Sequence, residues 1–92
     1  MLTIKRTAQF KKDFKRIIRQ GVNIQPLMDV VKKISNEEPL DEKFCDHPLK
    51  GEWLGFRECH IKPDWLLIYF VNKGELILTL SRTGSHSDLF AH

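Results

Sequence analysis

Seven consecutive apolar residues, Trp65-Leu-Leu-Ile-Tyr-Phe-Val71, form the longest unbroken apolar run of the chain. The run is much shorter than the roughly 20 residues that a helix needs to cross a bilayer core. Because it contains no polar position, neither side of this segment is suited to face water. The run therefore predicts a strand at the centre of a sheet, covered on both faces, inside a globular domain.

The residues before position 36 show the pattern of one short strand followed by two helices. Leu2 and Ile4 alternate with polar residues, which predicts the strand. Apolar residues then recur with the 3.6-residue period of an amphipathic helix over residues 8–20, and again after Pro26. The two apolar stripes consist of Phe10, Phe14, Ile17 and Ile18, and of Leu27, Val30, Val31 and Ile34. Gly21 ends the first helix, and the short connection predicts a helical hairpin.

From residue 53 onward the apolar period changes from 3.6 to 2, which is typical of strands. Three strands are predicted, at residues 53–61, 65–72 and 75–81, with turns at Pro63-Asp64 and Lys73-Gly74. In the third strand Leu76, Leu78 and Leu80 are expected to share one face. The acidic stretch 36–51 is expected to be a loop, and residues 82–92 a short, mostly polar tail.

These elements together predict an α+β fold, in which residues 1–92 form a single domain. An N-terminal strand precedes an α-helical hairpin, and a three-stranded antiparallel meander follows, in the order β-α-α-β-β-β. The helices are expected to pack on one face of the sheet. Apolar residues make up 41% and charged residues 29% of the chain, a balance that excludes intrinsic disorder.

The N-terminal segment Met1–Arg6 lacks the apolar stretch of an export signal, so we expect a cytoplasmic protein without a membrane partner. Cys45 and Cys59 are then expected to be reduced thiols. Within residues 1–20, seven basic side chains accompany one acid, Asp13. This basic end indicates either a polyanionic or acidic partner or simply a solvated helix face.

Five titratable or cationic residues in the second half are candidates for chemistry. These are His47, His60, Asp64, Arg82 and His86. The last four flank strand ends that an antiparallel meander brings to the same edge of the sheet, whereas His47 reaches them only if the acidic loop folds back. Imidazoles transfer protons near neutral pH, and a guanidinium binds phosphate. RNA supplies its own 2′-hydroxyl nucleophile, so this set suits RNA cleavage without a metal or other cofactor.

Two other kinds of site are less well supported by the spacing. Cys45-x-His47 and Cys59-His60 contain potential zinc ligands, but neighbouring residues on a strand point to opposite faces. We therefore predict no metal site and expect the cysteines to be small apolar fillers. A catalytic triad of Ser85, His86 and Asp88 lacks a nucleophile-elbow motif.

Four aromatic residues could stack on unpaired bases. Trp53 and Phe56 are expected on opposite faces of one strand, so at least one belongs to the core. Trp65, beside the turn at Asp64, and Phe90, near the C-terminus, are the better candidates for contact with RNA. Satisfied core or surface positions are the alternative for every one of these residues.

Three stretches of the chain resemble the YafQ branch of the RelE superfamily of bacterial toxins. They are Asp46-His-Pro-Leu-Lys-Gly-Glu-Trp53, Phe56-Arg-Glu-Cys-His-Ile-Lys-Pro-Asp-Trp-Leu-Leu-Ile-Tyr69 and Ser81-Arg-Thr-Gly-Ser-His-Ser-Asp-Leu-Phe90. The resemblance extends over essentially the whole chain, and residues 46–90 carry its specific motifs. It implies a RelE-like fold.

The resemblance also implies a toxin of a type II toxin–antitoxin pair that cuts mRNA in the ribosomal A site through the 2′-hydroxyl, without a metal. His47 then belongs to the D-H-P-L motif of the family. His60, Asp64 and Trp65 belong to the H-x-x-P-D-W motif. Arg82 and His86 belong to the R-x-G-x-H motif, and Phe90 is the terminal aromatic residue. His86 is the expected general acid and Arg82 the phosphate ligand. His60 or Asp64, with His47 as a weaker choice, is the expected base, and Asp64 could instead orient His60.

The partners implied are a cognate antitoxin, mRNA on the ribosome, and 16S ribosomal RNA, with operator DNA reached only through the antitoxin. The basic first helix, with Lys11, Lys12, Lys15 and Arg16, is the expected surface for ribosomal RNA or an acidic antitoxin segment. The alternative is a catalytically weak homologue that acts as an antitoxin-binding module and transcriptional co-repressor.

Overall fold

One mixed sheet forms the centre of the computed structural model, which describes residues 1–90. Its strands are β1 (Thr3–Arg6), β2 (His47–Pro48), β3 (Arg57–Lys62), β4 (Trp65–Asn72) and β5 (Ile77–Gly84). They lie in the order β1-β5-β4-β3-β2, so the apolar run forms the central strand, as predicted. β3, β4 and β5 form the expected antiparallel meander, and β1 pairs with β5 in parallel.

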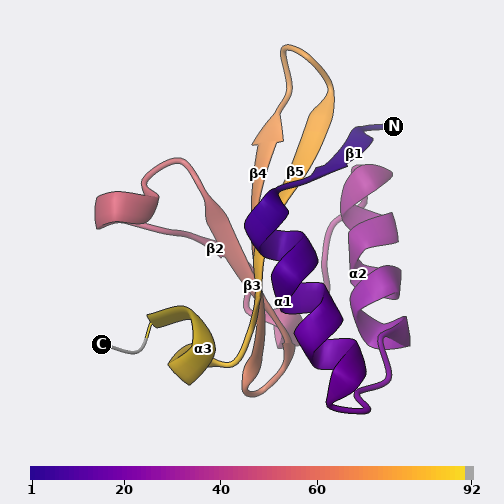
Figure 1. Ribbon diagram of the computed structural model, residues 1–92. Helices are drawn as coiled ribbons and strands as arrows, with labels where there is room; N and C mark the ends of the chain where they lie inside the picture. The colour runs from indigo at the N-terminus through magenta and orange to yellow at the C-terminus, as the bar shows by residue number, and fades with distance from the viewer. Residues whose placement is uncertain (91–92) are drawn as a thin grey trace.

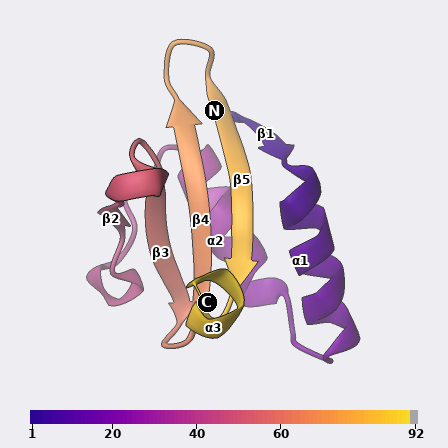
Figure 2. The same cartoon turned by 60° about the vertical axis from the view of Figure 1, so that its left-hand side comes forward.

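Helices cover both faces of this sheet. α1 (Ala8–Arg19) and α2 (Gln25–Ser35) form the predicted helical hairpin and lie together on one side (Figure 1). A third helix, α3 (His86–Phe90), lies across the end of β5 on the other side (Figures 1 and 2). No helix or strand was predicted for residues 82–92, but β5 continues to Gly84 and α3 follows it, whereas positions 91 and 92 lie outside the described residues. In the described part, no helix has the length and apolar composition needed to span a membrane.

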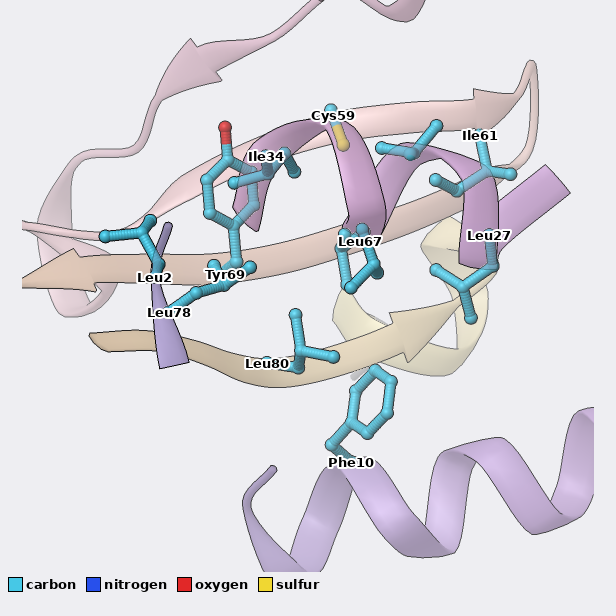
Figure 3. Close-up of a cluster of buried hydrophobic side chains, with 12 residues drawn as sticks. Leu2, Phe10, Leu27, Ile34, Cys59, Ile61, Leu67, Tyr69, Leu78 and Leu80 are labelled. Atoms are coloured by element: carbon cyan, nitrogen blue, oxygen red, sulfur yellow. The ribbon is translucent and has the colours of Figure 1, made fainter. Parts of the chain in front are cut away.

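The alternating side chains of β4 divide the core into two clusters. Leu67 and Tyr69 face α1 and α2 and belong to the main cluster, which also contains Phe10 and Cys59 (Figure 3). Leu66 and Ile68 point to the opposite face and pack with Leu89 of α3. Because successive residues of a strand point to opposite faces, the apolar run needed a cover on each side. The buried position of Cys59 agrees with a filler role, whereas Cys45 is exposed, so the prediction that it is an apolar filler is wrong.

The first strand of the meander begins four residues later than predicted. Residues 51–53 form a short 3₁₀ turn instead, between Gly51 and Gly55, which both have positive φ. Trp53 and Phe56 therefore lie on the same side, edge to face with ring centroids 5.2 Å apart, and not on opposite faces. Both rings pack against the second core cluster.

The third strand of the meander is displaced towards the C-terminus. Leu76 has φ of 57° and is exposed in the hairpin turn, so the prediction that it shares a face with Leu78 and Leu80 is wrong. Leu80 pairs with Tyr69, but Arg82 pairs with Ile68, so Ser81 is an extra residue, a β-bulge. This bulge reverses the alternation, so Arg82 faces the side of α3 and not the side of the buried Leu80.

The acidic stretch expected to be a loop contains a 3₁₀ turn at Glu42–Phe44 and the two-residue strand β2. β2 pairs with β3 so that His47 lies opposite Glu58. The acidic stretch therefore folds back towards the other candidate residues, as His47 required, because β2 pairs with β3 at the edge of the sheet.

Candidate active site

A single row of paired residues crosses four strands on the face that carries α3. His47 pairs with Glu58, Glu58 with Ile68, and Ile68 with Arg82. Paired residues of neighbouring antiparallel strands project to the same face. The row therefore brings two predicted site residues and one buried acid onto one surface of the sheet.

His60 and His86 meet at the next position along this face. Their ring centroids lie 5.7 Å apart, with His60 half-buried on β3 and His86 exposed at the start of α3. Asp64, in the turn between β3 and β4, accepts hydrogen bonds from the backbone nitrogen and from Nδ1 of His86, each at 3.1 Å. The predicted convergence of His60, Asp64 and His86 thus holds, with Asp64 against His86 and not against His60.

The contacts between Asp64 and His86 define how the imidazole is held. Hydrogen bonds from the backbone and then the ring of His86 keep the pKa of Asp64 below its ordinary value, so this carboxylate is ionised at neutral pH. An ionised carboxylate only accepts hydrogen bonds, so Nδ1 of His86 carries the proton in this contact. Nε2 is the nitrogen left to meet a substrate.

Glu58 joins two of the predicted histidines and was not among the predicted site residues. Its side chain is buried, and Oε1 lies 3.2 Å from Nε2 of His47 and 3.5 Å from Nε2 of His60. The sequence could have predicted that Glu58 lies near His60, because residues two apart on a strand share a face. The sequence could not have predicted the contact between Glu58 and His47, since this contact depends on the pairing of the two-residue strand β2 with β3.

The residue before His47 fixes the start of β2 from the opposite face. Asp46 accepts hydrogen bonds from Nε and Nη2 of Arg57, at 3.3 Å and 3.1 Å to Oδ2, and from the hydroxyl of Tyr69. Burial and the contact with Asp46 raise the pKa of Tyr69, so its hydroxyl keeps its proton. The aspartate of the D-H-P-L motif therefore anchors the segment that carries His47.

Arg82 is held by an acid on α1. Its Nε lies 2.8 Å and its Nη2 3.2 Å from the carboxylate of Asp13, which is fully buried and also accepts a hydrogen bond from the backbone of Thr83. Burial alone raises the pKa of Asp13, but the hydrogen bonds from Arg82, Thr83 and Gln9 outweigh it and leave that pKa below its ordinary value. Asp13 thus ties the first helix to the strand that carries the site arginine.

The four cations of α1 that were predicted to bind RNA divide into two kinds. Lys11, Lys12 and Lys15 are exposed. Arg16 is half-buried instead, 3.5 Å from Asp13 and 3.5 Å from Asp88 of α3. The guanidinium of Arg16 therefore links α1 to the helix that begins with His86. This link is a structural role, independent of any contact between Arg16 and RNA.

The two aromatic residues predicted to contact RNA lie on different faces. Trp65 packs on the main core, opposite to the histidines, and its Nε1 donates to Oγ1 of Thr83 at 3.0 Å. Phe90 lies on the side of the site, with its ring centroid 6.3 Å from that of His86. This arrangement favours Phe90 over Trp65 as a contact for a base.

A groove lies beside this cluster and not over it. Its volume is about 1050 Å³, and both apolar and charged residues of α2, of the turn at residues 42–44 and of the end of β3 line it. His60 is the residue that it shares with the cluster. Because an RNA strand needs an open surface carrying proton-transfer groups, we place the candidate active site at the histidines.

The fold, with a helical hairpin on one face of the sheet and imidazole, guanidinium and carboxylate groups on the other, defines the RelE-type class of small bacterial toxins. Residues 2–91 match the family model described as the bacterial toxin of type II toxin–antitoxin systems, YafQ. The chain belongs to this YafQ toxin family.

Individual relatives match the chain along nearly its whole length. The mRNA interferase toxin YafQ of Escherichia coli (strain K12) is 36% identical over 88 residues, 95% of this chain and 94% of that protein. A metal-bound toxin from Helicobacter pylori is 49% identical, with a TM-score of 0.92 over 98% of this chain and 100% of that one. The DinJ–YafQ complex of E. coli gives a TM-score of 0.87 at 35% identity, over 98% of this chain and 99% of that one.

Proposed function

We propose that this protein is a ribosome-dependent mRNA endoribonuclease that cleaves RNA by metal-independent acid–base catalysis. The observation that carries the proposal is the pair of imidazoles, His60 and His86, with ring centroids 5.7 Å apart on one open face. Two proton-transfer groups at this separation suit a phosphodiester that loses one proton and gains another. The relative named an mRNA interferase supports the same reaction class.

His86 is the proposed general acid. Asp64 fixes the ring through Nδ1, so a proton on Nε2 of the imidazolium is directed to the substrate. The leaving 5′-oxygen takes that proton as the bond between phosphorus and this oxygen breaks. Asp64 acts as a positioning residue, in the way that a buried aspartate orients the imidazole of a serine protease.

His60 is the proposed general base. It takes the proton of the 2′-hydroxyl while the 2′-oxygen forms a bond to phosphorus, so the product carries a 2′,3′-cyclic phosphate. The low pKa of Asp64 makes that carboxylate a poorer base at neutral pH. His47 is the weaker choice because both of its ring nitrogens already face oxygen atoms, of Pro48 and Glu58.

Arg82 is the proposed ligand of the scissile phosphate. Its guanidinium is positioned by Asp13 and keeps donors for a further acceptor, since an arginine carries five N–H groups. Phosphate binding by a guanidinium also stabilises the charge that grows in the transition state. Phe90, beside His86, is the proposed stacking contact for a base.

The proposed partners follow from the same function. mRNA on the ribosome is the substrate, and 16S ribosomal RNA is the surface that the exposed lysines of α1 contact in the cytoplasm. The E. coli relative forms a complex with DinJ, which supports a cognate antitoxin for this chain. Operator DNA is then bound only through that antitoxin.

Cleavage of a translated mRNA by the purified chain tests this proposal. The reaction is run with and without ribosomes, in the presence of chelator, and with His86→Ala. We expect chelator-resistant cuts that require ribosomes and fall about 10²–10⁴-fold in the variant, the usual contribution of general acid catalysis.

Ser87→Ala is the matched control, because Ser87 is an exposed neighbour on the same helix. Its cleavage rate should equal that of the parent. Activity that disappears with chelator would refute metal independence, and a His86→Ala variant within about tenfold of the parent would refute the acid assignment. No cleavage under any condition would favour the antitoxin-binding module.

A further inference from the structure

We propose that Asp13 of α1 is a positioning residue of the cleavage reaction, because it holds one edge of the Arg82 guanidinium and leaves the opposite edge to bind the scissile phosphate. This role rests on the proposed function, in which Arg82 is the ligand of that phosphate. The role requires the negative charge of Asp13, and it decides which nitrogens of Arg82 meet the phosphate. No motif of the sequence pointed to it, since Asp13 is a single acid in a basic segment.

The contact between Asp13 and Arg82 uses two of the five N–H groups of the guanidinium. Nε lies 2.8 Å from Oδ2 and Nη2 lies 3.2 Å from Oδ1, so both carboxylate oxygens bind the same edge. The remaining N–H groups belong to Nη1 and to the far side of Nη2. Nη1 and Nη2 form a second pair of parallel donors, of the kind that binds two oxygens of one phosphate.

The second edge of the guanidinium is the one that a substrate can reach. Nη1 of Arg82 has no hydrogen-bond partner among the described residues and is not shut off from solvent. Arg82 pairs with Ile68, which belongs to the second core cluster, so its side chain projects to the face that carries α3. A phosphate bound at Nη1 and Nη2 therefore lies on the same face as His60 and His86.

The surroundings of Asp13 suit it to hold another side chain and not to act on RNA. Its own side chain is fully buried. The carboxylate also accepts hydrogen bonds from the backbone nitrogen of Thr83 and from Nε2 of Gln9, both at 3.2 Å. Nη1 of Arg16 lies 3.5 Å away. An ionised carboxylate offers about four lone-pair sites, so this one has none left for a substrate.

The arrangement needs both the charge of Asp13 and the shape of Arg82. In Asp13→Asn the amide nitrogen would face an N–H group, which leaves one buried donor unpaired. The guanidinium then loses the contact that fixes which edge faces the phosphate. In Arg82→Lys the ammonium is one point charge without a second fork, so its contact with Asp13 withdraws it from the phosphate. Positive charge at position 82 is therefore not sufficient for the reaction.

Cleavage of ribosome-bound mRNA under single-turnover conditions, in which slow cleavage stays measurable, tests this role. We expect Asp13→Asn to lower the maximal rate at least about tenfold and to change the half-saturating ribosome concentration no more than about threefold, because the contacts with the ribosome stay intact. Arg82→Lys should also lose at least about tenfold. Because Arg82 is only half-buried, this variant tests the role even where Asp13→Asn destabilises the fold. A maximal rate of Arg82→Lys within about threefold of the parent would overturn the proposal, since a point charge would then suffice.

A double-mutant cycle separates positioning from a purely structural role. Asp13→Asn is compared in the parent and in Arg82→Ala, and thermal unfolding is measured for each chain. If Asp13 acts through Arg82, Asp13→Asn should lower the rate of Arg82→Ala by less than about twofold. Equal factors in the two backgrounds would refute the role, because Asp13 would then act through the fold or through its contact with Arg16.

Gln9→Ala is the matched control, because Gln9 is exposed and donates to the same carboxylate through a contact that does not involve Arg82. Its maximal rate should stay within about twofold of the parent. A loss as large as that of Asp13→Asn would assign the effect to the helix and not to the guanidinium. A parent chain that never cleaves RNA would overturn the proposed function, whereas a parent that cleaves but gives equal factors in the cycle would overturn only the role of Asp13.

Discussion

Asp64 provides a test of single-residue positioning that is separate from folding. Its side chain is exposed, and its carboxylate holds the backbone and ring nitrogens of His86. Asp64→Asn should therefore leave the midpoint of thermal unfolding nearly unchanged. Cleavage should fall at least about tenfold, because a neutral amide stabilises the imidazolium less than a carboxylate does.

The pH profile distinguishes this role from a structural one. The alkaline limb of the profile should move to lower pH in Asp64→Asn, since the acid loses its proton more easily without the neighbouring negative charge. Asp29→Asn, an exposed acid on α2, is the control and should keep the parental profile. An unchanged profile in Asp64→Asn would show that Asp64 does not act through His86.

The sequence predicted which residues gather at the candidate site more readily than it predicted which side chains contact one another. His60, Asp64 and His86 meet as expected, because their positions at strand ends follow from the meander itself. Asp64 contacts His86 and not His60, since the turn after β3 directs its carboxylate towards the start of α3. Glu58 was missed because its role needs a partner 11 positions away along the chain.

At the scale of elements, the docking of α3 depends on one glycine. Gly84 has φ of 151°, and an added Cβ would lie 2.8 Å from Nη2 of Arg16 and 3.2 Å from Cβ of Asp88. Gly84→Ala should push α3 away from α1 and displace His86. We expect a loss of about 1–3 kcal/mol in unfolding free energy and a cleavage rate lowered by about tenfold or more.

Gly74→Ala in the distant hairpin turn is the control for this prediction. Its added Cβ meets the side chain of Asn72 at 3.4 Å, an ordinary contact. Thermal unfolding and the cleavage assay measure the two effects for both variants. A Gly84→Ala protein as stable and as active as the Gly74→Ala protein would contradict the role of the close approach at Gly84.

The helices α1 and α2 followed from periodicity because their stripes are long enough to show the 3.6-residue pattern. The shorter elements escaped prediction for physical reasons. β2 has two residues and exists only through pairing with β3, and α3 has five residues whose position depends on Leu89 packing on the second cluster. The bulge at Ser81 inserts one residue into an otherwise regular alternation, so the face on which Arg82 lies could not be read from the period of two.

At the scale of the whole molecule, the sheet separates packing from chemistry. The helical hairpin covers one face with the main core, whereas the other face has a smaller core and the site groups (Figure 1). Asp13 and Arg16 connect the two sides at the edge of β5, where α1 contacts both Arg82 and Asp88. The basic helix is therefore a support of the site as well as a charged surface.

This double role changes how the ribosomal contact of α1 should be tested. Neutralising Arg16 together with the lysines would loosen α3 and lower activity for a structural reason. The triple variant Lys11→Gln, Lys12→Gln and Lys15→Gln removes exposed charge alone. If each lysine meets one phosphate, the slope of log K for ribosome binding against log salt should flatten by about 2–3.

Cosedimentation with ribosomes over a salt series measures that slope, and thermal unfolding confirms that the triple variant stays folded. A variant with Lys32, Lys33 and Lys73 replaced by glutamine carries the same loss of charge on other exposed positions and should retain most of the parental slope. Slopes that flatten equally in the two variants would mean that the net charge of the chain, and not the surface of α1, attracts the ribosome. An unchanged slope in both would assign the lysines of α1 to the antitoxin or to solvent.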